Sequence, residues 1–240
     1  KLERIEVNLL KTCDKVWCSA FHHMRWLKNE GLDQIAYYPV LVPDNSNREM
    51  IIANRRKKQK KKRQFISLIG NVNGTSTLSG LHFFKDQIIP IIKNKPMSMD
   101  FEFRIIGGGR LMNDLEHEFN KYEWIKRIGF VADIQEEFLS SDIILVPTPL
   151  PLGFRTRIAE AFSYGCCVIA HQNNTLGMPE LENGKNILLA RTGPEFVKAI
   201  NLCIEDQNLR KSLAKEARKT YEQNYDSEKV IEKVLDFCSS

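Results

Sequence analysis

The sequence contains no long apolar run. None of its stretches approaches the roughly 20 consecutive apolar residues that a membrane-spanning helix needs, and no signal peptide is visible at its start. Because the chain opens at Lys1 and not at a methionine, we expect a further N-terminal segment before it. These absences favour a cytoplasmic protein, and membrane association at the cytoplasmic face would then need a peripheral contact.

Cysteine does not occur in the pattern that secreted proteins use. The six cysteines show no paired, regular spacing and stand mostly among apolar residues, so we expect reduced thiols. Cys13, Cys18, His22 and His23 have the residue types of a zinc site. However, Cys18 ends an expected buried strand and the two histidines begin an expected helix. We therefore predict no metal.

One stretch lacks acidic residues and is crowded with basic ones. Eight of the nine residues from Arg55 to Arg63 are Lys or Arg, and the rest of the chain carries 27 basic against 30 acidic residues. The simpler interpretation is a solvated linker between domains. The alternative is a patch that contacts an anionic membrane, at about 1 kcal/mol per basic residue. No aromatic residue interleaves with the charges, so we expect no nucleic-acid partner.

The chain divides at this basic stretch. Before it, we expect a helix at residues 1–10, a strand at 15–19, a helix at 21–30 and a strand at 34–42. Four such elements cannot enclose a core of their own. Residues 1–43 are therefore predicted to belong to a second, larger unit, and residues 44–63 to be the basic linker.

After the linker, strands and helices alternate regularly. The expected strands are apolar and lie at residues 64–69, 100–106, 124–128, 143–146, 166–170 and 186–190. This alternation is typical of an α/β fold in which a Rossmann-like parallel sheet carries helices on both faces. Ligands of such folds bind beyond the carboxyl ends of the strands. The loops that follow the strands are therefore the candidate site.

The first three of these loops contain many small residues. Residues 70–75 form a flexible loop whose backbone N–H groups can approach a diphosphate. Residues 107–110 begin with three glycines but lack the spacing of a dinucleotide fingerprint. Residues 129–133 follow the third strand. Each loop alone also fits a plain surface turn.

The fourth loop and its helix, within residues 151–170, are the most informative part of the sequence. On the expected helix, apolar side chains share one side, whereas Thr156, Arg157, Glu160 and Tyr164 fall on the other. A helix N-terminus, arginines and a carboxylate can together hold a phosphorylated ligand that bears sugar hydroxyls. The alternative is an ordinary amphipathic helix in which Arg157 and Glu160 form a solvated pair.

This segment resembles the donor-binding segment of the group 1 (family 4) glycosyltransferases. Gly153 and Phe154 match a Gly-Phe of the family motif, Glu160 begins a matching Glu-Ala, and Gly165 precedes a matching strand. The order and spacing of all four loops extend the resemblance over nearly all of residues 64–235.

The sequence also departs from the family motif. Leu152 stands where the family has its first glutamate, and Arg155-Thr156-Arg157 replaces Gly-Leu-Pro. Some branches of the family carry such basic loops. The loss of the first carboxylate leaves open whether the chain has kept the usual activity.

The resemblance implies a GT-B protein, which consists of two Rossmann-like domains. Residues 1–43 would be the end of the N-terminal acceptor-side domain, and residues 64–240 the C-terminal domain that binds a nucleotide-sugar donor. The implied reaction moves a sugar from a nucleoside diphosphate to an acceptor hydroxyl, with retention and with neither metal nor cofactor. The base, the sugar and the acceptor, whether glycan, lipid or protein, stay open.

The resemblance also implies a set of donor-binding residues. Glu160 would accept hydrogen bonds from the ribose, backbone groups near Val131 would contact the base, and Arg155 and Arg157 would stabilise the diphosphate. The whole predicted set is Gly70, Asn71, Asn73, Gly107, Gly108, Val131, Gly153, Phe154, Arg155, Thr156, Arg157 and Glu160. No catalytic residue is assigned, because the family carries acceptor-side groups in its N-terminal domain.

Two other function classes stay open. A sugar-nucleotide epimerase has the same architecture and binds the same ligands. A catalytically silent homologue would act as a nucleotide-sugar-binding scaffold subunit, which the Leu152 substitution makes credible. We expect residues 1–240 alone to be inactive as a transferase.

Overall fold

The computed structural model describes residues 2–44, 51, 63–94 and 100–239. Within the basic run, only Arg63 lies among the described residues. The linker and membrane interpretations of that run therefore both stay predictions.

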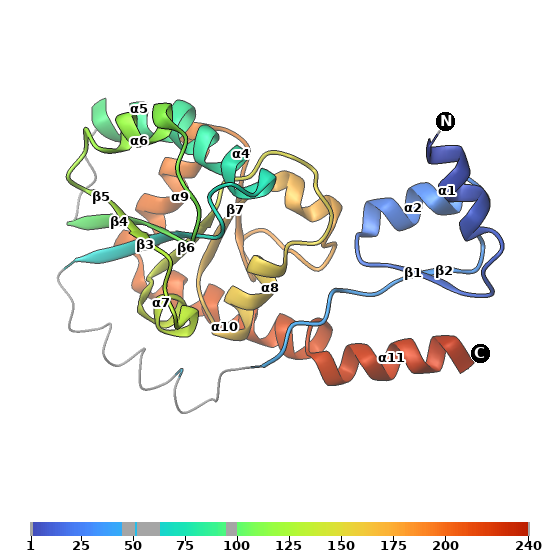
Figure 1. Ribbon diagram of the computed structural model, residues 1–240. Helices are drawn as coiled ribbons and strands as arrows, with labels where there is room; N and C mark the ends of the chain where they lie inside the picture. Colours follow the sequence, from blue (N-terminus) through green and yellow to red (C-terminus); the bar gives the residue numbers. More distant parts are fainter. Residues whose placement is uncertain (1, 45–50, 52–62, 95–99, 240) are drawn as a thin grey trace.

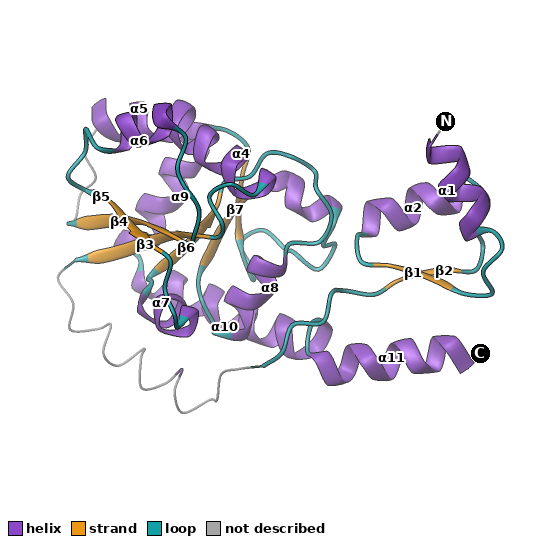
Figure 2. Cartoon of the chain, viewed as in Figure 1, coloured by secondary structure: helices purple, strands orange, loops and turns teal. Residues whose placement is uncertain are grey.

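Six strands form one parallel sheet (Figures 1 and 2). They are β3 (Gln64–Ile69), β4 (Phe101–Ile106), β5 (Ile125–Gly129), β6 (Ile143–Val146), β7 (Val168–His171) and β8 (Leu188–Ala190). Their order across the sheet is β5-β4-β3-β6-β7-β8, so the chain starts in the middle, builds one half outward and then returns to build the other. At the centre, Ile66 pairs with both Phe103 and Ile143. This is the doubly wound, Rossmann-like order, and the predicted α/β fold is confirmed.

Helices cover both faces of the sheet (Figure 2). One face is covered by α4 (Thr75–Phe83), the π-helical turn η1 (Phe84–Ile88), α5 (Ile89–Asn94), α6 (Asn113–Phe119) and α9 (Gly193–Glu205). The other is covered by α7 (Ile134–Ser140), α8 (Thr156–Ser163) and α10 (Gln207–Asn224). Strand β6 shows why two cores form: Ile143 and Leu145 belong to one, and Ile144 and Val146 to the other. Successive side chains of a strand point to opposite faces, and here both faces are buried.

The N-terminal part is small. It consists of α1 (Leu2–Leu10), β1 (Val16–Cys18), α2 (Phe21–Asn29) and β2 (Ile35–Tyr37), and its two strands pair in parallel. Its buried apolar cluster has only five members, which are Val7, Val16, Leu27, Leu32 and Ile35. A cluster of this size is consistent with the prediction that residues 1–43 are part of a larger unit, which stays a prediction.

The last helix, α11 (Ser227–Ser239), runs back beside the N-terminal part (Figure 1). The ring of Phe237 lies 5.7 Å from that of Tyr38, and Lys15 Nζ lies 4.9 Å from the Phe237 ring centroid. The segment after β2 is also tied to α10, because Tyr221 donates its hydroxyl hydrogen to the carbonyl of Val42 across 2.6 Å. The last helix and the N-terminal part therefore lie on the same side of the sheet domain (Figure 1).

Several elements are shorter than the sequence predicts. The strand expected at 34–42 pairs only over Ile35–Tyr37, apart from a single bridge at Val42. Pro39 lies just beyond it, and proline has no N–H to donate to a ladder.

Tyr164 was expected on the open side of α8, but it follows the last helical residue, is buried, and stacks on Phe138 with ring centroids 5.2 Å apart.

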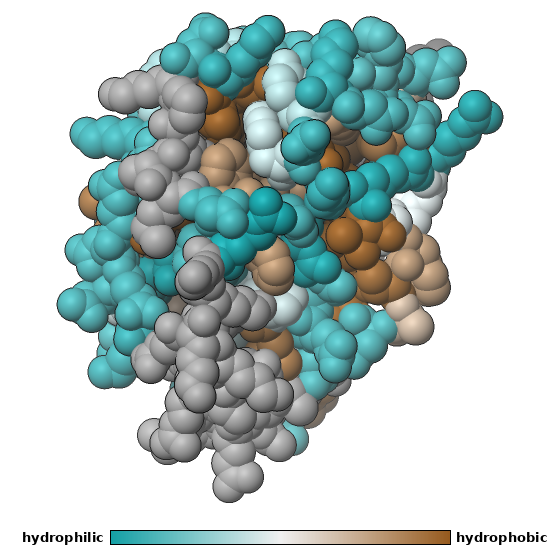
Figure 3. Space-filling model, turned by 90° about the vertical axis from the view of Figure 1, so that its left-hand side faces the viewer, coloured by the Kyte–Doolittle hydropathy of each residue, from teal (hydrophilic) through white to brown (hydrophobic). Residues whose placement is uncertain are grey.

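The described surface gives no sign of a membrane span. Among the helices that the structure describes, none combines the length and apolarity needed to cross a bilayer. Figure 3 shows the face at the β5 end of the sheet, where hydrophilic side chains predominate among the coloured residues.

Candidate functional site

Two helices begin at the point where the winding of the sheet reverses. β3 and β6 are neighbours in the sheet, and the chain leaves them towards α4 and α8 respectively. Gly74 and Arg155 precede these helices, and neither helix has a side chain that caps its first turn. N–H groups of two helix N-termini therefore face the edge at which an open α/β sheet binds its ligands. We call this edge, where the strands end, the carboxyl edge.

Arg157 bridges these two helices. It stands in the first turn of α8, and its Nη2 donates a hydrogen bond to Oγ1 of Thr77 in α4 across 3.1 Å. The guanidinium crosses Gly70 so closely that a Cβ on that residue would lie 1.9 Å from Nη2. Gly70 also has a φ of +146°, which side chains rarely permit. A glycine is thus required at this point, and its absent side chain leaves the space that the arginine fills.

The glycine loops after β3 and β4 touch backbone to backbone. Gly107 has a φ of +139°, and a Cβ there would lie 2.1 Å from the carbonyl oxygen of Gly70. The N–H of Val72 donates to the carbonyl of Gly108 across 3.0 Å. The structure therefore brings together the two loops that the sequence analysis selected separately.

The two asparagines of the first loop lie at this edge, but their side chains serve the loops. Asn71 Oδ1 accepts from the N–H of Asn73 at 2.9 Å. The Asn73 amide binds both the N–H and the carbonyl of Arg110, each at 3.0 Å. These contacts hold the β3 loop against the β4 loop, so any ligand contact here falls chiefly to the backbone.

Arg155 differs from Arg157 although both belong to the same loop. It is only 7% exposed, and its Nε donates to Asn174 Oδ1 at 2.8 Å while Nη2 donates to the carbonyl of Leu150 at 2.7 Å. Burial, and then the neighbouring Arg157, lower the pKa of Arg155 to about 10. Arg155 braces the loop before α8 against the 3-10 helix η2 (Gln172–Leu176).

The rest of the Gly-Phe segment positions the start of α8. Gly153 adopts a φ of +44°, and the loop there passes so close to Gly177 that a Cβ on Gly177 would lie 2.3 Å from the Gly153 carbonyl oxygen. Phe154 packs edge-on against Tyr225 with ring centroids 5.4 Å apart. Thr156, the first helical residue, is exposed.

Glu160 is a half-buried carboxylate on the same helix. Among the described residues its carboxylate makes no hydrogen bond and forms no ion pair within 4.0 Å, because Arg157 reaches to Thr77 instead. Burial raises the pKa of Glu160, and the charge of Arg157 opposes this rise. The solvated Arg157–Glu160 pair of an ordinary amphipathic helix is not the arrangement seen. The carboxylate keeps its capacity to accept hydrogen bonds.

The loop after β5 completes the carboxyl edge. Its Gly129 carbonyl accepts from the N–H of Gly107 at 2.7 Å, which places Val131 next to the β4 loop. Val131 is half-buried against the core, whereas Phe130 is 80% exposed. A Cβ on Gly108 would lie 3.8 Å from the Phe130 ring.

Three residues of this site were not predicted from the sequence. Thr77 holds Arg157, Asn174 holds Arg155, and Phe130 stands free beside Val131. Only Phe130 had a sequence signal, because a large apolar residue in a turn is unusual. Leu152, at the position of the missing glutamate, is 39% exposed and lies in the same loop as Arg155. Within the described part of the chain, no group of three or more His, Cys, Asp or Glu side chains is arranged to hold a metal ion.

The same architecture occurs in solved structures. HepE from Anabaena, in complex with UDP, has a TM-score of 0.81 at 19% identity, and the alignment covers 98% of this chain and 66% of that one. A TarM mutant from S. aureus gives 0.75 at 14% identity, covering 99% and 46%. Sucrose-phosphate synthase from Thermosynechococcus elongatus gives 0.74 at 16%, covering 99% and 62%. These likenesses show a shared GT-B fold, and the chain spans about two thirds of the length of HepE.

Sequence comparison identifies the family directly. No curated protein sequence matches the chain significantly. However, residues 63–206, more than half of the 240, match the family model described as "Glycosyl transferases group 1". The chain therefore belongs to the group 1 glycosyl transferases.

Proposed function

We propose that the carboxyl edge of the sheet binds a nucleoside-diphosphate sugar, and that the complete protein transfers the sugar to an acceptor hydroxyl with retention. HepE was solved with UDP and with UDP-glucose, so a uridine nucleotide is the first donor to test. We expect no metal or other cofactor. Under this proposal residues 64–240 are the donor-binding domain, residues 1–43 end the acceptor-side domain, and the protein acts in the cytoplasm.

The observation that carries this proposal is the position of Arg157. Its guanidinium crosses Gly70 and bonds Thr77, so one cation lies between the first turns of α4 and α8. A diphosphate placed there would meet the uncapped N–H groups of both helices and the arginine together. As the sugar departs, negative charge grows on this diphosphate, and these groups would stabilise it in the transition state.

The other residues of the proposed site would contact the ribose and the base or support the loops. Glu160 would accept hydrogen bonds from the ribose, since its carboxylate has no hydrogen-bond partner among the described residues. Backbone groups around Val131 and Gly107 would contact the base. Arg155 would not touch the donor but would hold the loop before α8 in place. Acceptor and catalytic groups belong to the N-terminal domain, of which residues 1–43 would be the end.

A catalytically silent binding subunit is the second candidate. The observation that favours it is Leu152, an apolar side chain in the loop where the family has a carboxylate. Donor hydrolysis by the full-length protein separates the enzyme from the scaffold, and product analysis separates a transferase from an epimerase.

The deciding experiment is a thermal-shift series with UDP, GDP, ADP, UMP, uridine and UDP-glucose. A ligand at 100 times its dissociation constant adds about 2.7 kcal/mol to the free energy of unfolding. We expect one nucleoside diphosphate to raise the melting temperature and its nucleoside to raise it less. The matched control is Lys198→Ala, which removes one exposed charge from α9. If no nucleotide stabilises the protein, the proposal fails.

A peripheral membrane contact through the basic run is a separate proposal. If the run from Arg55 to Arg63 binds anionic lipid, sedimentation with phosphatidylserine vesicles should be salt-sensitive and should fall when its lysines become glutamines. Unchanged sedimentation would leave the linker interpretation.

A further inference from the structure

Two buried cysteines lie side by side below a pocket that the proposed function does not use. Cys167 directly precedes β7 and Cys203 belongs to α9. Their sulfur atoms are 3.6 Å apart and share one S–H···S hydrogen bond. A disulfide bond is about 2.05 Å long, so the sulfurs need to approach by roughly 1.5 Å to become bonded.

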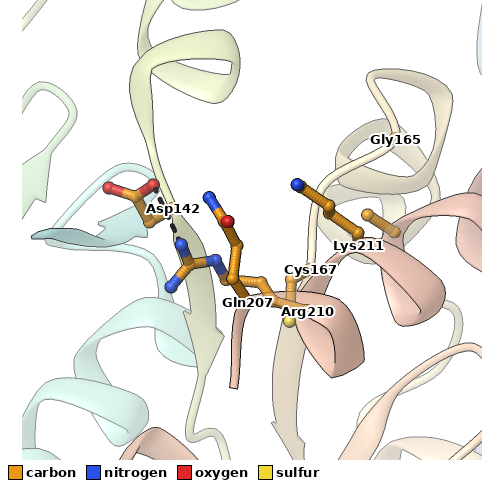
Figure 4. Close-up of a pocket in the computed structure, with 7 residues that line it drawn as sticks. Asp142, Gly165, Cys167, Gln207, Arg210 and Lys211 are labelled. Carbon is orange, nitrogen blue, oxygen red and sulfur yellow. Dashed lines mark ion pairs between the residues drawn. The ribbon is translucent and has the colours of Figure 1, made fainter. Parts of the chain in front are cut away.

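The pocket lies at the amino ends of the strands, opposite the carboxyl edge. It has a volume of about 50 Å³ and is lined by Cys167, Asp142, Gly165, Gln207, Arg210, Lys211 and Ala214 (Figure 4). Asp142 directly precedes β6, and the other lining residues come from the turn before β7 and from α10. The pocket gives a small, polar reagent a route to Cys167, a residue that is only 2% exposed.

A cation lies beside the two sulfurs. Arg210 Nη1 donates to the carbonyl oxygen of Cys203 at 2.8 Å, and its Nη2 lies 4.0 Å from the buried carboxylate of Asp142. Figure 4 shows Arg210 beside Cys167 and joined to Asp142. Asp142 is held in turn by the N–H of Phe65, at 2.9 Å. Each terminal nitrogen of the Arg210 guanidinium therefore has a partner, which fixes the position of the side chain.

This arrangement favours a thiolate. The hydrogen bond from Cys167 lowers the pKa of Cys203, and burial opposes this effect. The charge of Arg210 lowers the pKa further, and the charge of Asp206 raises it. The two thiols titrate as a pair: once the first proton has left, the remaining S–H donates a hydrogen bond to the thiolate and stabilises it. The thiolate is the form of cysteine that reacts with oxidants.

We propose that Cys167 and Cys203 are a redox-active dithiol that a small peroxide, entering through this pocket, oxidises to a disulfide. The pair first releases one proton. The proton shared by the two sulfurs passes to Cys203, and the Cys167 thiolate, which belongs to the residue that lines the pocket, attacks one oxygen of hydrogen peroxide and becomes a sulfenic acid. The hydroxide released takes the proton of Cys203. The second sulfur then displaces the sulfenic hydroxyl as hydroxide, which takes up the first proton. Two thiols and one peroxide thus give one disulfide and two waters.

The test is disulfide mapping after treatment of the folded protein with hydrogen peroxide. Free thiols are alkylated, the protein is digested without reduction, and bridged peptides are identified by mass spectrometry. We expect a bridge between the peptide of Cys167 and that of Cys203, reversed by dithiothreitol. The control variant is Cys166→Ser, because Cys166 is adjacent in sequence but bonds the carbonyl of Phe138. The bridge should persist in it and be absent from Cys167→Ala.

Three outcomes would overturn the proposal. In the first, Cys167 and Cys203 both remain fully alkylatable after peroxide treatment and denaturation. In the second, the bridge joins Cys166 instead. In the third, the bridge forms only in urea. The wild-type map decides the question even where the Cys167 variant does not fold. The role of Arg210 has its own test in Arg210→Gln, for which the pH profile of the oxidation rate should move to higher pH. An unmoved profile would exclude Arg210 as the stabilising cation.

Discussion

Arg157 and Thr77 are 80 residues apart in sequence, yet their side chains meet across 3.1 Å. The contact joins the first turns of two helices that leave neighbouring strands, and it passes over a glycine that has no room for a side chain. A long, flexible cation is thereby given one position before any ligand arrives. Binding then costs less side-chain entropy than it would for a free arginine.

The first prediction concerns Arg157 itself. Arg157→Ala should weaken binding of the nucleoside diphosphate by about 1.5–3 kcal/mol, the range for a hydrogen bond to a charged group. Binding of the nucleoside should change much less, because the proposed site places the arginine at the phosphates and not at the base. Titration calorimetry with UDP and uridine measures both. Thr77→Val, which keeps the shape but removes the anchor, should give a smaller loss of the same kind. Equal losses for both ligands would mean that α8 had been disrupted.

The second prediction separates the two arginines. Arg155→Ala should lower the free energy of unfolding by about 1–3 kcal/mol, because Asn174 Oδ1 and the Leu150 carbonyl lose their donor inside the protein. Thr156→Ala, at the neighbouring exposed position, should leave stability nearly unchanged. Urea denaturation followed by circular dichroism checks this difference. An Arg155 variant of wild-type stability would contradict the bracing role.

The third prediction concerns the nucleotide contact of Glu160. Glu160→Gln keeps the shape of the side chain but replaces a charged acceptor, so nucleoside binding should weaken by about 1.5–3 kcal/mol while the domain stays folded. Calorimetry with uridine and UDP measures the loss. Because Glu160 is assigned to the ribose, both ligands should lose about equally. Loss with UDP alone would move Glu160 to the phosphates.

The fourth prediction is a pH dependence at the same residue. Burial raises the pKa of Glu160 above the ordinary 4.5, and Arg157 opposes the rise. The folded protein therefore keeps the proton to higher pH than the unfolded chain, and the stability that the protonated carboxyl contributes is present below 4.5 and lost as the pH rises through the folded pKa. Glutamine never ionises. As the pH rises through this window, the free energy of unfolding of the wild type should therefore fall relative to that of Glu160→Gln. Urea denaturation at several pH values can measure this change. A difference that stays constant with pH would show that Glu160 is solvated.

The fifth prediction compares two neighbouring glycine loops. Gly70→Ala should cost about 1–3 kcal/mol of stability from backbone strain alone, and its Cβ would displace the Arg157 guanidinium. Nucleotide binding should fall with it. Gly108→Ala is the matched control for stability, since its φ is not positive and its Cβ would meet nothing closer than 3.8 Å. Thermal unfolding and calorimetry on both variants test the pair, and equal tolerance at both positions would contradict the assigned geometry.

The sequence predicts the sheet well for a physical reason. Strands buried on both faces, such as Ile143–Val146, must be apolar throughout, so they stand out against polar loops. The same alternation locates the loops that meet at the carboxyl edge, which is why Gly70, Gly107 and Arg157 could be named together.

The sequence does not predict which arginine faces the edge. Arg155 and Arg157 are two residues apart. The first points inward because it bonds the carbonyl of Leu150 and the side chain of Asn174, which lies beyond the next strand in sequence. Tyr164 was misplaced for a similar reason, because helical periodicity no longer applies at the residue where α8 ends. Contacts between distant segments decide both cases, and a local pattern carries no information about them.

Helix α11 follows the sheet domain in sequence but packs against residues that precede the linker. The linker therefore does not separate the chain into two parts that pack independently. A protein cut at the linker and kept from residue 64 onward would still carry Phe237, whose neighbours Tyr38 and Lys15 would be gone. Its last helix would then project into water with Ile231 and Leu235, already 45% and 61% exposed, and with one further aromatic ring uncovered. Isolation of the sheet domain for crystallography is therefore better served by ending the chain before Ser227 than by retaining α11.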